Sequence, residues 1–65
     1  MNDLAVGDTV IMTCDNGAVI AGPWNGTATF QNEPIVTVGK RTEYFRSVTE
    51  IVKVTECVRV FKRES

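Results

Sequence analysis

The sequence of 65 residues contains no histidine and only two cysteines, Cys14 and Cys57. A structural zinc site takes four Cys or His ligands, so we expect no metal site and no cofactor. Histidine is also the side chain that most often transfers protons at neutral pH, and neither thiol has one to activate it. The two serines, Ser47 and Ser65, complete no nucleophilic triad without it. The sequence therefore predicts a protein that is not an enzyme.

Secretion and membrane signals are sparse as well. A secreted domain this small normally carries several disulfides, and residues 1–5 contain an acid and no apolar run. We therefore expect two reduced thiols in an intracellular, cytoplasmic protein, although pairing of Cys14 with Cys57 stays open. No apolar run approaches the roughly 18 residues that cross a bilayer, so no membrane association is expected.

The length indicates a single domain, residues 1–65, near the lower limit at which a chain buries enough apolar surface to fold alone. Several disulfides and a structural metal are the usual aids at this size, and both are missing here. Self-association is the remaining aid, so we expect a homo-oligomer.

Positive charge is absent from the first 39 residues. All seven Lys and Arg lie in residues 40–65 beside four glutamates, whereas residues 1–39 carry four acidic side chains and no cation. The net charge of −1 therefore hides an acidic N-terminal part and a basic C-terminal part. Such segregation favours electrostatic complementarity to a second copy or to a protein surface of mixed charge.

Turn residues divide the chain into short runs typical of β-strands. Asn16-Gly17, between the run of residues 9–14 and the run of residues 18–21, is the strongest hairpin signal. With these two as the loop residues, the predicted cross-strand pairs are Cys14 with Val19, Met12 with Ala21, and Val10 with Pro23.

Further turn signals follow at short intervals. Gly22-Pro23 should end the second strand or place it at an edge, and Asn25-Gly26 predicts a second tight turn. After that we expect a loop at residues 31–34, a strand at residues 35–38, a turn with a cationic tip at residues 39–42, and a return strand at residues 44–46.

Residues 48–61 are ambiguous between helix and strand. Ser47 followed by Glu50 fits a capping box, and apolar residues recur at helical spacing. Against a helix, eight of these fourteen residues are Val, Ile or Thr, which favour a pleated strand. We favour a short 3₁₀ turn at residues 47–50, a strand at residues 51–54, a kink at Thr55-Glu56 and a strand at residues 58–62. The expected inward residues are Val52, Val54, Val58 and Val60, with Lys53 and Arg59 pointing outward.

This order of elements, opening with Val6-Gly7-Asp8-Thr9-Val10, resembles the small SH3-like barrels of the Tudor and KOW kind over residues 4–54. The resemblance implies a mainly β fold: a five- or six-stranded antiparallel SH3-like barrel or strongly curved sheet with one short 3₁₀ turn. It also implies binding of proteins, RNA or DNA rather than catalysis. No aromatic spacing in the chain indicates a cage for methylated side chains.

Candidate binding residues are the aromatic side chains near turns and the cations. Trp24 is either a core aromatic or an exposed anchor for a partner. Lys53, Arg59, Lys62 and Arg63 are typical of strand and tail positions that protect a sheet edge. The predicted partner-binding set is Trp24, Lys40, Arg41, Tyr44, Arg46 and Arg59.

The function that fits best is a non-enzymatic protein-binding module, such as a small accessory or inhibitor protein of the kind frequent in phages and mobile elements. One alternative is a nucleic-acid-binding barrel that uses the basic C-terminal part, with an aromatic side chain stacking on a base. Another is a homo-oligomer that binds a small anionic ligand through arginine.

Overall fold

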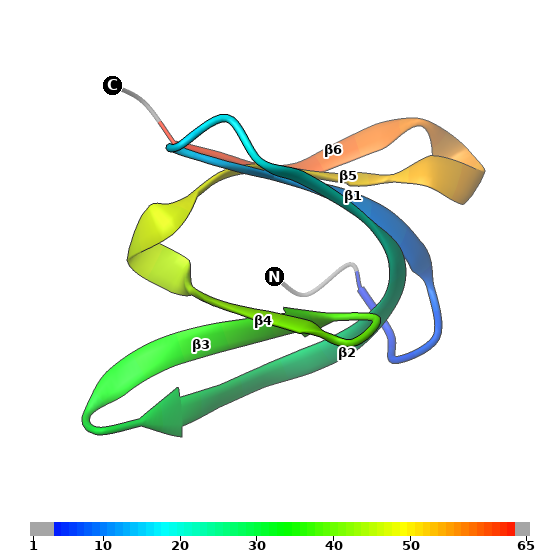
Figure 1. Ribbon diagram of the computed structural model, residues 1–65. Helices are drawn as coiled ribbons and strands as arrows, with labels where there is room; N and C mark the ends of the chain where they lie inside the picture. Colours follow the sequence, from blue (N-terminus) through cyan, green and yellow to red (C-terminus); the bar gives the residue numbers. More distant parts are fainter. Residues whose placement is uncertain (1–3, 64–65) are drawn as a thin grey trace.

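The structure, a computed structural model, describes residues 4–63. These residues form six strands and two 3₁₀ helices (Figure 1). The elements are β1 (Thr9–Cys14), β2 (Val19–Phe30), β3 (Glu33–Val38), β4 (Arg41–Tyr44), η1 (Phe45–Ser47), β5 (Val48–Lys53), η2 (Val54–Glu56) and β6 (Val58–Lys62). The mainly β prediction is confirmed, and residues 48–61 form β5 and most of β6, separated by η2, rather than one helix. No helix in this part of the chain is long and apolar enough to span a membrane.

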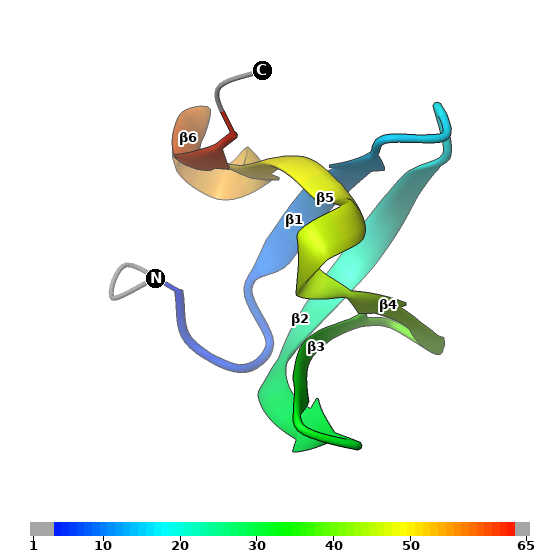
Figure 2. The ribbon, with the colours of Figure 1, turned by 90° about the vertical axis from the view of Figure 1, so that its left-hand side faces the viewer.

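The strands form one antiparallel sheet in the order β4-β3-β2-β1-β5-β6. The long strand β2 joins its two parts: β1, β5 and β6 lie on one side of the core, and β3 and β4 lie on the other (Figures 1 and 2). Within residues 4–63 no pairing joins the edge strands β4 and β6. The expectation of a closed barrel or strongly curved sheet is therefore wrong. Strand β4 has only four residues, and the chain then leaves the edge through η1.

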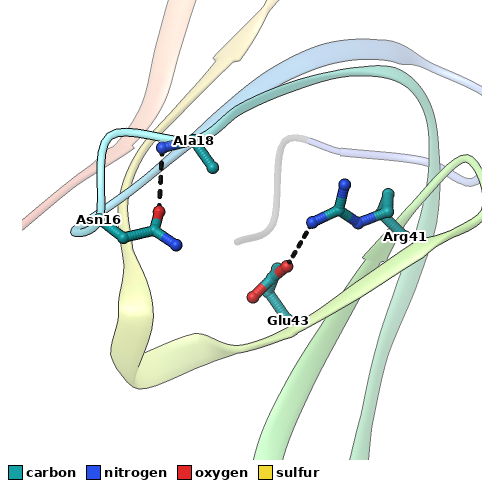
Figure 3. Close-up of polar contacts among 4 residues, drawn as sticks. All are labelled: Asn16, Ala18, Arg41 and Glu43. Carbon is teal, nitrogen blue, oxygen red and sulfur yellow. Dashed lines mark hydrogen bonds and ion pairs between the residues drawn. The ribbon is translucent and has the colours of Figure 1, made fainter.

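The first hairpin has a three-residue loop, Asp15-Asn16-Gly17. The Cys14 N–H donates to the Ala18 carbonyl at 2.9 Å, and Gly17 takes a φ of 89°. The Asn16 side chain accepts the Ala18 N–H at 2.9 Å (Figure 3). Because the glycine occupies the third loop position, Met12 pairs with Ile20 rather than with Ala21. The predicted register is thus wrong by one residue.

Strand β2 continues through Gly22-Pro23 and Asn25-Gly26, so the expected second turn is wrong. Its first part pairs with β1 as far as Pro23, and its second part pairs with β3 from Trp24 onward. Pro23 has no N–H, and its carbonyl accepts the Gly39 N–H at 2.8 Å. Gly26, at a φ of 95°, lies in a bulge where the register shifts.

The later elements are displaced by a few residues from their predicted places. β3 begins at Glu33 after the two-residue turn Gln31-Asn32, and Gly39-Lys40 forms the predicted cationic tip. The return strand ends at Tyr44 because the next three residues form η1. The predicted 3₁₀ turn therefore lies at residues 45–47 rather than at residues 47–50. The kink predicted at Thr55-Glu56 is the second 3₁₀ helix, η2.

The core lies on the inner face of the sheet and contains no buried polar side chain among the described residues. Its buried members are Val10, Met12, Cys14, Ile20, Trp24, Val36, Val38, Val48 and Ile51. Val54 and Val58 are exposed rather than inward, and Ile51 is inward. The register of β5 with β1 shifts between Thr13 and Cys14, which leaves Thr49 as an extra residue in β5. This bulge explains why Val48 and Ile51 are both buried and why the predicted alternation fails here.

Candidate functional site

The outer face of β2, β3 and β4 carries apolar side chains that the core does not use. Val36 and Val38 point into the core, so their neighbours Ile35 and Thr37 point outward. The register places Tyr44 beside Ile35, and the Thr37 and Thr42 hydroxyls lie 3.1 Å apart. These residues therefore belong to one continuous outer surface.

A hollow of about 380 Å³ is lined by Phe30, Ile35, Thr42 and Tyr44 from this surface, and by Glu43, which lies between Thr42 and Tyr44 on β4. We call it the outer hollow. Phe30 ends β2, where residues 27–30 are all exposed, and its side chain is 52% exposed. A large aromatic side chain is thus held at the rim of an apolar depression whose volume falls within the usual range for binding pockets.

Arg46 is fixed beside the outer hollow by two contacts. Its guanidinium lies 4.7 Å from the centre of the Tyr44 ring, and Nη1 donates to Glu33 Oε1 at 3.0 Å. Helix η1 positions it, because the chain turns back over the end of β4 there. An exposed cation–π contact contributes about 0.5–1 kcal/mol and a surface ion pair about 0.2–1 kcal/mol, so together they favour this orientation of a side chain that remains largely exposed.

The structure separates most of the other predicted binding residues. Trp24 is 4% exposed and belongs to the core, the first of its two interpretations. Arg41 stands on the inner side of β4, opposite to Tyr44, and pairs with Glu43 at 3.2 Å (Figure 3). Lys40 lies in the exposed turn, and Arg59 lies on β6, where it pairs with Glu50 at 3.8 Å. Only Tyr44 and Arg46 of the predicted set come together at the outer hollow.

Sequence reasoning missed Phe30 and Ile35 as members of the site. A signal for Phe30 was its place immediately before the turn Gln31-Asn32, where a strand leaves the core. A signal for Ile35 was the alternation along its strand, because a residue that neighbours the inward-pointing Val36 must face the other side of the sheet.

The segregated charges pair with one another across the molecule. Lys53 lies 3.5 Å from Asp8 and 3.3 Å from Glu56. The Ala5 N–H lowers the pKa of Asp8, and Lys53 adds to this effect. Burial acts to lower the pKa of Lys53, but the carboxylates of Glu56 and Asp8 outweigh it, and the pKa is raised. The acidic and basic parts of the sequence are therefore partly neutralised by folding.

The two thiols are free in the structure. Burial raises the pKa of Cys14, and Glu43 and Asp15 act in the same direction, so this thiol is held in its unreactive protonated form. Cys57 is exposed at the end of η2. Among residues 4–63 no three Cys, Asp or Glu side chains are grouped closely enough to hold a metal ion.

The chain matches no protein family model, no curated protein and no solved structure. The outer hollow is therefore the candidate site with the most structural support.

Proposed function

We propose that the protein is a non-enzymatic protein-binding module that docks on a partner protein through the outer hollow. The observation that carries this proposal is Phe30, a half-exposed aromatic side chain at the rim of an apolar hollow, with the oriented Arg46 close by. Aromatic and arginine side chains beside a pocket dominate the energetics of protein interfaces. Such a surface suits a small accessory or inhibitor protein that acts by docking.

The nucleic-acid alternative has less support. Binding to phosphates requires cations that are free to replace counterions. Arg41, Arg46, Lys53 and Arg59 instead pair with carboxylates, and Arg63 donates to the carbonyl oxygens of Val48 and Phe45. The small-ligand alternative would use Arg46, whose guanidinium contacts the Tyr44 ring of the hollow but already pairs with Glu33.

We also propose a distant relationship to the SH3-like barrels, with the sheet left open. Two features support this relationship. Helix η1 lies between β4 and β5, as the expected short 3₁₀ turn would, and β5 returns to pair with β1.

Site-specific photocrosslinking in cells tests the proposed function. A photoreactive phenylalanine analogue replaces Phe30 in one variant and Val19 in another. Val19 is 64% exposed and lies near the other end of β2, so it serves as a control of similar accessibility. We expect a defined protein adduct from position 30 and none from position 19. Equal labelling from both positions, or adducts with nucleic acid alone, would contradict the proposal.

A pair of arginine variants sharpens this test. Arg46→Ala removes the cation beside the outer hollow, whereas Arg59→Ala removes a similarly exposed, similarly paired cation from β6. We expect Arg46→Ala to weaken the position 30 adduct and Arg59→Ala to leave it unchanged. The reverse result would move the docking surface to β6.

A further inference from the structure

Strand β4 offers a free edge to another strand. It ends the sheet next to β3, and no other strand within residues 4–63 pairs with it. Arg41 and Thr42 are exposed, and Glu43 and Tyr44 are half-buried. Unpaired edges of this kind recruit further strands unless the protein blocks them.

The register identifies which backbone groups face that free edge. Gly39 donates its N–H to Pro23 on β2, so the odd-numbered residues of β3 direct their backbone groups toward β2 and the even-numbered ones toward β4. Val38 and Val36 therefore bond to Arg41 and Glu43, while Thr37 and Thr42 form a pair without backbone bonds. The close approach of the two threonine hydroxyls agrees with this assignment. Thr42 consequently presents its N–H and C=O to the free edge.

The charges on β4 are symmetric about Thr42. Arg41 and Glu43 flank it, point to the same side of the strand and pair with each other at 3.2 Å (Figure 3). If a second copy of β4 ran antiparallel with Thr42 opposite Thr42, each Arg41 would stand opposite Glu43 of the second copy. These would be the pairs without backbone bonds, in which side chains approach most closely.

The same charges disfavour other registers. A shift of two residues in one direction places Arg41 opposite Arg41, and a shift in the other direction places Glu43 opposite Glu43. In Thr42 the N–H and C=O groups face the free edge. A shift of one residue would place them opposite a residue whose N–H and C=O groups bond to β3 instead. Among these registers, the pairing centred on Thr42 alone satisfies both the hydrogen bonds and the charges.

We propose that the chain forms a twofold symmetric dimer in which β4 pairs antiparallel with β4 of a second copy, centred on Thr42. The two sheets then become one continuous sheet, and self-association of this kind is a common aid to the stability of small domains. The twofold axis is perpendicular to the sheet, so the two outer hollows lie on the same face. This dimer goes beyond the proposed docking function, and neither proposal depends on the other.

A charge exchange tests the pairing by solution mass measurement, such as light scattering after gel filtration, over a dilution series. We expect the wild-type protein to have twice the monomer mass. Arg41→Glu alone and Glu43→Arg alone should lose the dimer, because each sets like charges opposite one another. Mixed in equal amounts, these two variants should regain the dimer mass as a heterodimer, since every opposed pair is then of opposite sign.

Three outcomes would overturn the proposal: a wild-type monomer at every concentration, single variants that dimerise as well as wild type, or a mixture that stays monomeric. Far-UV circular dichroism and urea midpoints of each variant show whether it is folded, so loss of the fold is not mistaken for loss of pairing.

Crosslinking at the twofold axis provides a second test that leaves the charges intact. Thr42→Cys in a Cys57→Ser background places two cysteines in directly opposed positions, with their Cα atoms about 5.5 Å apart, a separation that a disulfide spans. Thr37→Cys in the same background places the thiol on the same face, one strand further from the edge. We expect mild oxidation to link the Thr42→Cys protein into dimers and to leave the Thr37→Cys protein monomeric. Equal linking, or none at position 42, would contradict the pairing.

Discussion

Ile11 and Ile51 show how strongly the effect of one residue type depends on its place in the sheet. Ile51 is 0% exposed and pairs with Met12 in the core, whereas Ile11 is 36% exposed on the other face. We expect Ile51→Val to lower the free energy of unfolding by about 0.5–1.5 kcal/mol. Ile11→Val should change it by less than about 0.5 kcal/mol. Urea denaturation of both variants measures the difference. Equal decreases in the free energy of unfolding would show that Ile51 is no more buried than Ile11.

Asp8 makes the stability of the fold depend on acid. Its carboxylate accepts the Ala5 N–H at 2.9 Å and lies near Lys53, and its pKa is lowered. Because the folded pKa is below the unfolded one, Asp8 stabilises the fold above the unfolded pKa of about 4, and this contribution disappears as pH falls through the folded pKa. We therefore expect Asp8→Asn to be less stable than wild type at pH 7.

The pH series that checks this prediction compares urea midpoints of wild type and Asp8→Asn from neutral to strongly acidic conditions. The gap between the two proteins should narrow below about pH 4 and close when Asp8 is protonated in the folded state. A gap that stays constant over the series would mean that the asparagine acts through something other than the lost charge.

Among the elements, the turn between β2 and β3 carries unusual backbone strain. Gln31 and Asn32 have φ values of 51° and 65°, a region that side chains other than Asn and Gly rarely adopt. We expect Gln31→Gly to raise the free energy of unfolding by about 0.5–1 kcal/mol. Lys40 occupies the two-residue turn between β3 and β4 without positive φ, so Lys40→Gly should destabilise instead. Urea midpoints of the two variants should therefore move in opposite directions.

The elements also show which parts of the fold local sequence could predict. Residues 48–61 were identified as strands because β-branched side chains lose freedom in a helix, a property of the residues themselves. Asn25-Gly26 was mistaken for a turn because its role depends on distant residues. Trp24 donates its N–H to the Asp8 carbonyl and accepts the Gly7 N–H, and these bonds hold β2 extended where it changes partner. No short sequence pattern predicts a hydrogen bond between residues so far apart in the chain.

The candidate site was predictable to a similar degree. Tyr44 and Arg46 were found because they are close in sequence and flank a turn. Phe30 was missed because its exposure depends on how far β2 extends past the core, which is a consequence of its pairing with β3. Trp24 followed turn-like residues in the sequence, yet the continuity of β2 places it in the core.

For the whole molecule, the segregation of charge along the chain changes its meaning once the fold is known. Asp8 and Glu33 from the acidic part pair with Lys53 and Arg46 from the basic part. Folding therefore brings opposite charges together within one chain, and partner binding is not needed to explain the pattern. The charges of β4 remain notable because their symmetry about Thr42 suits a second copy.

The position of Trp24 allows a test of whether the two parts of the sheet unfold together. It lies where β2 changes partner from β1 to β3, and the core around it includes Met12 from one part and Val36 from the other. A single core shared in this way favours one cooperative transition. We expect tryptophan fluorescence and far-UV circular dichroism to give the same urea midpoint.

A substitution in the smaller part of the sheet makes this test stricter. Val36→Ala should lower both midpoints equally, although far-UV circular dichroism reports on all the strands and tryptophan fluorescence reports on the surroundings of Trp24. Ile35→Ala, on the outer face of the same strand, should lower them much less, because Ile35 is not part of the buried core. If Val36→Ala separated the fluorescence transition from the dichroism transition, β3 and β4 would unfold independently of β1, β5 and β6. The shared core would then be insufficient to couple the two parts of the sheet.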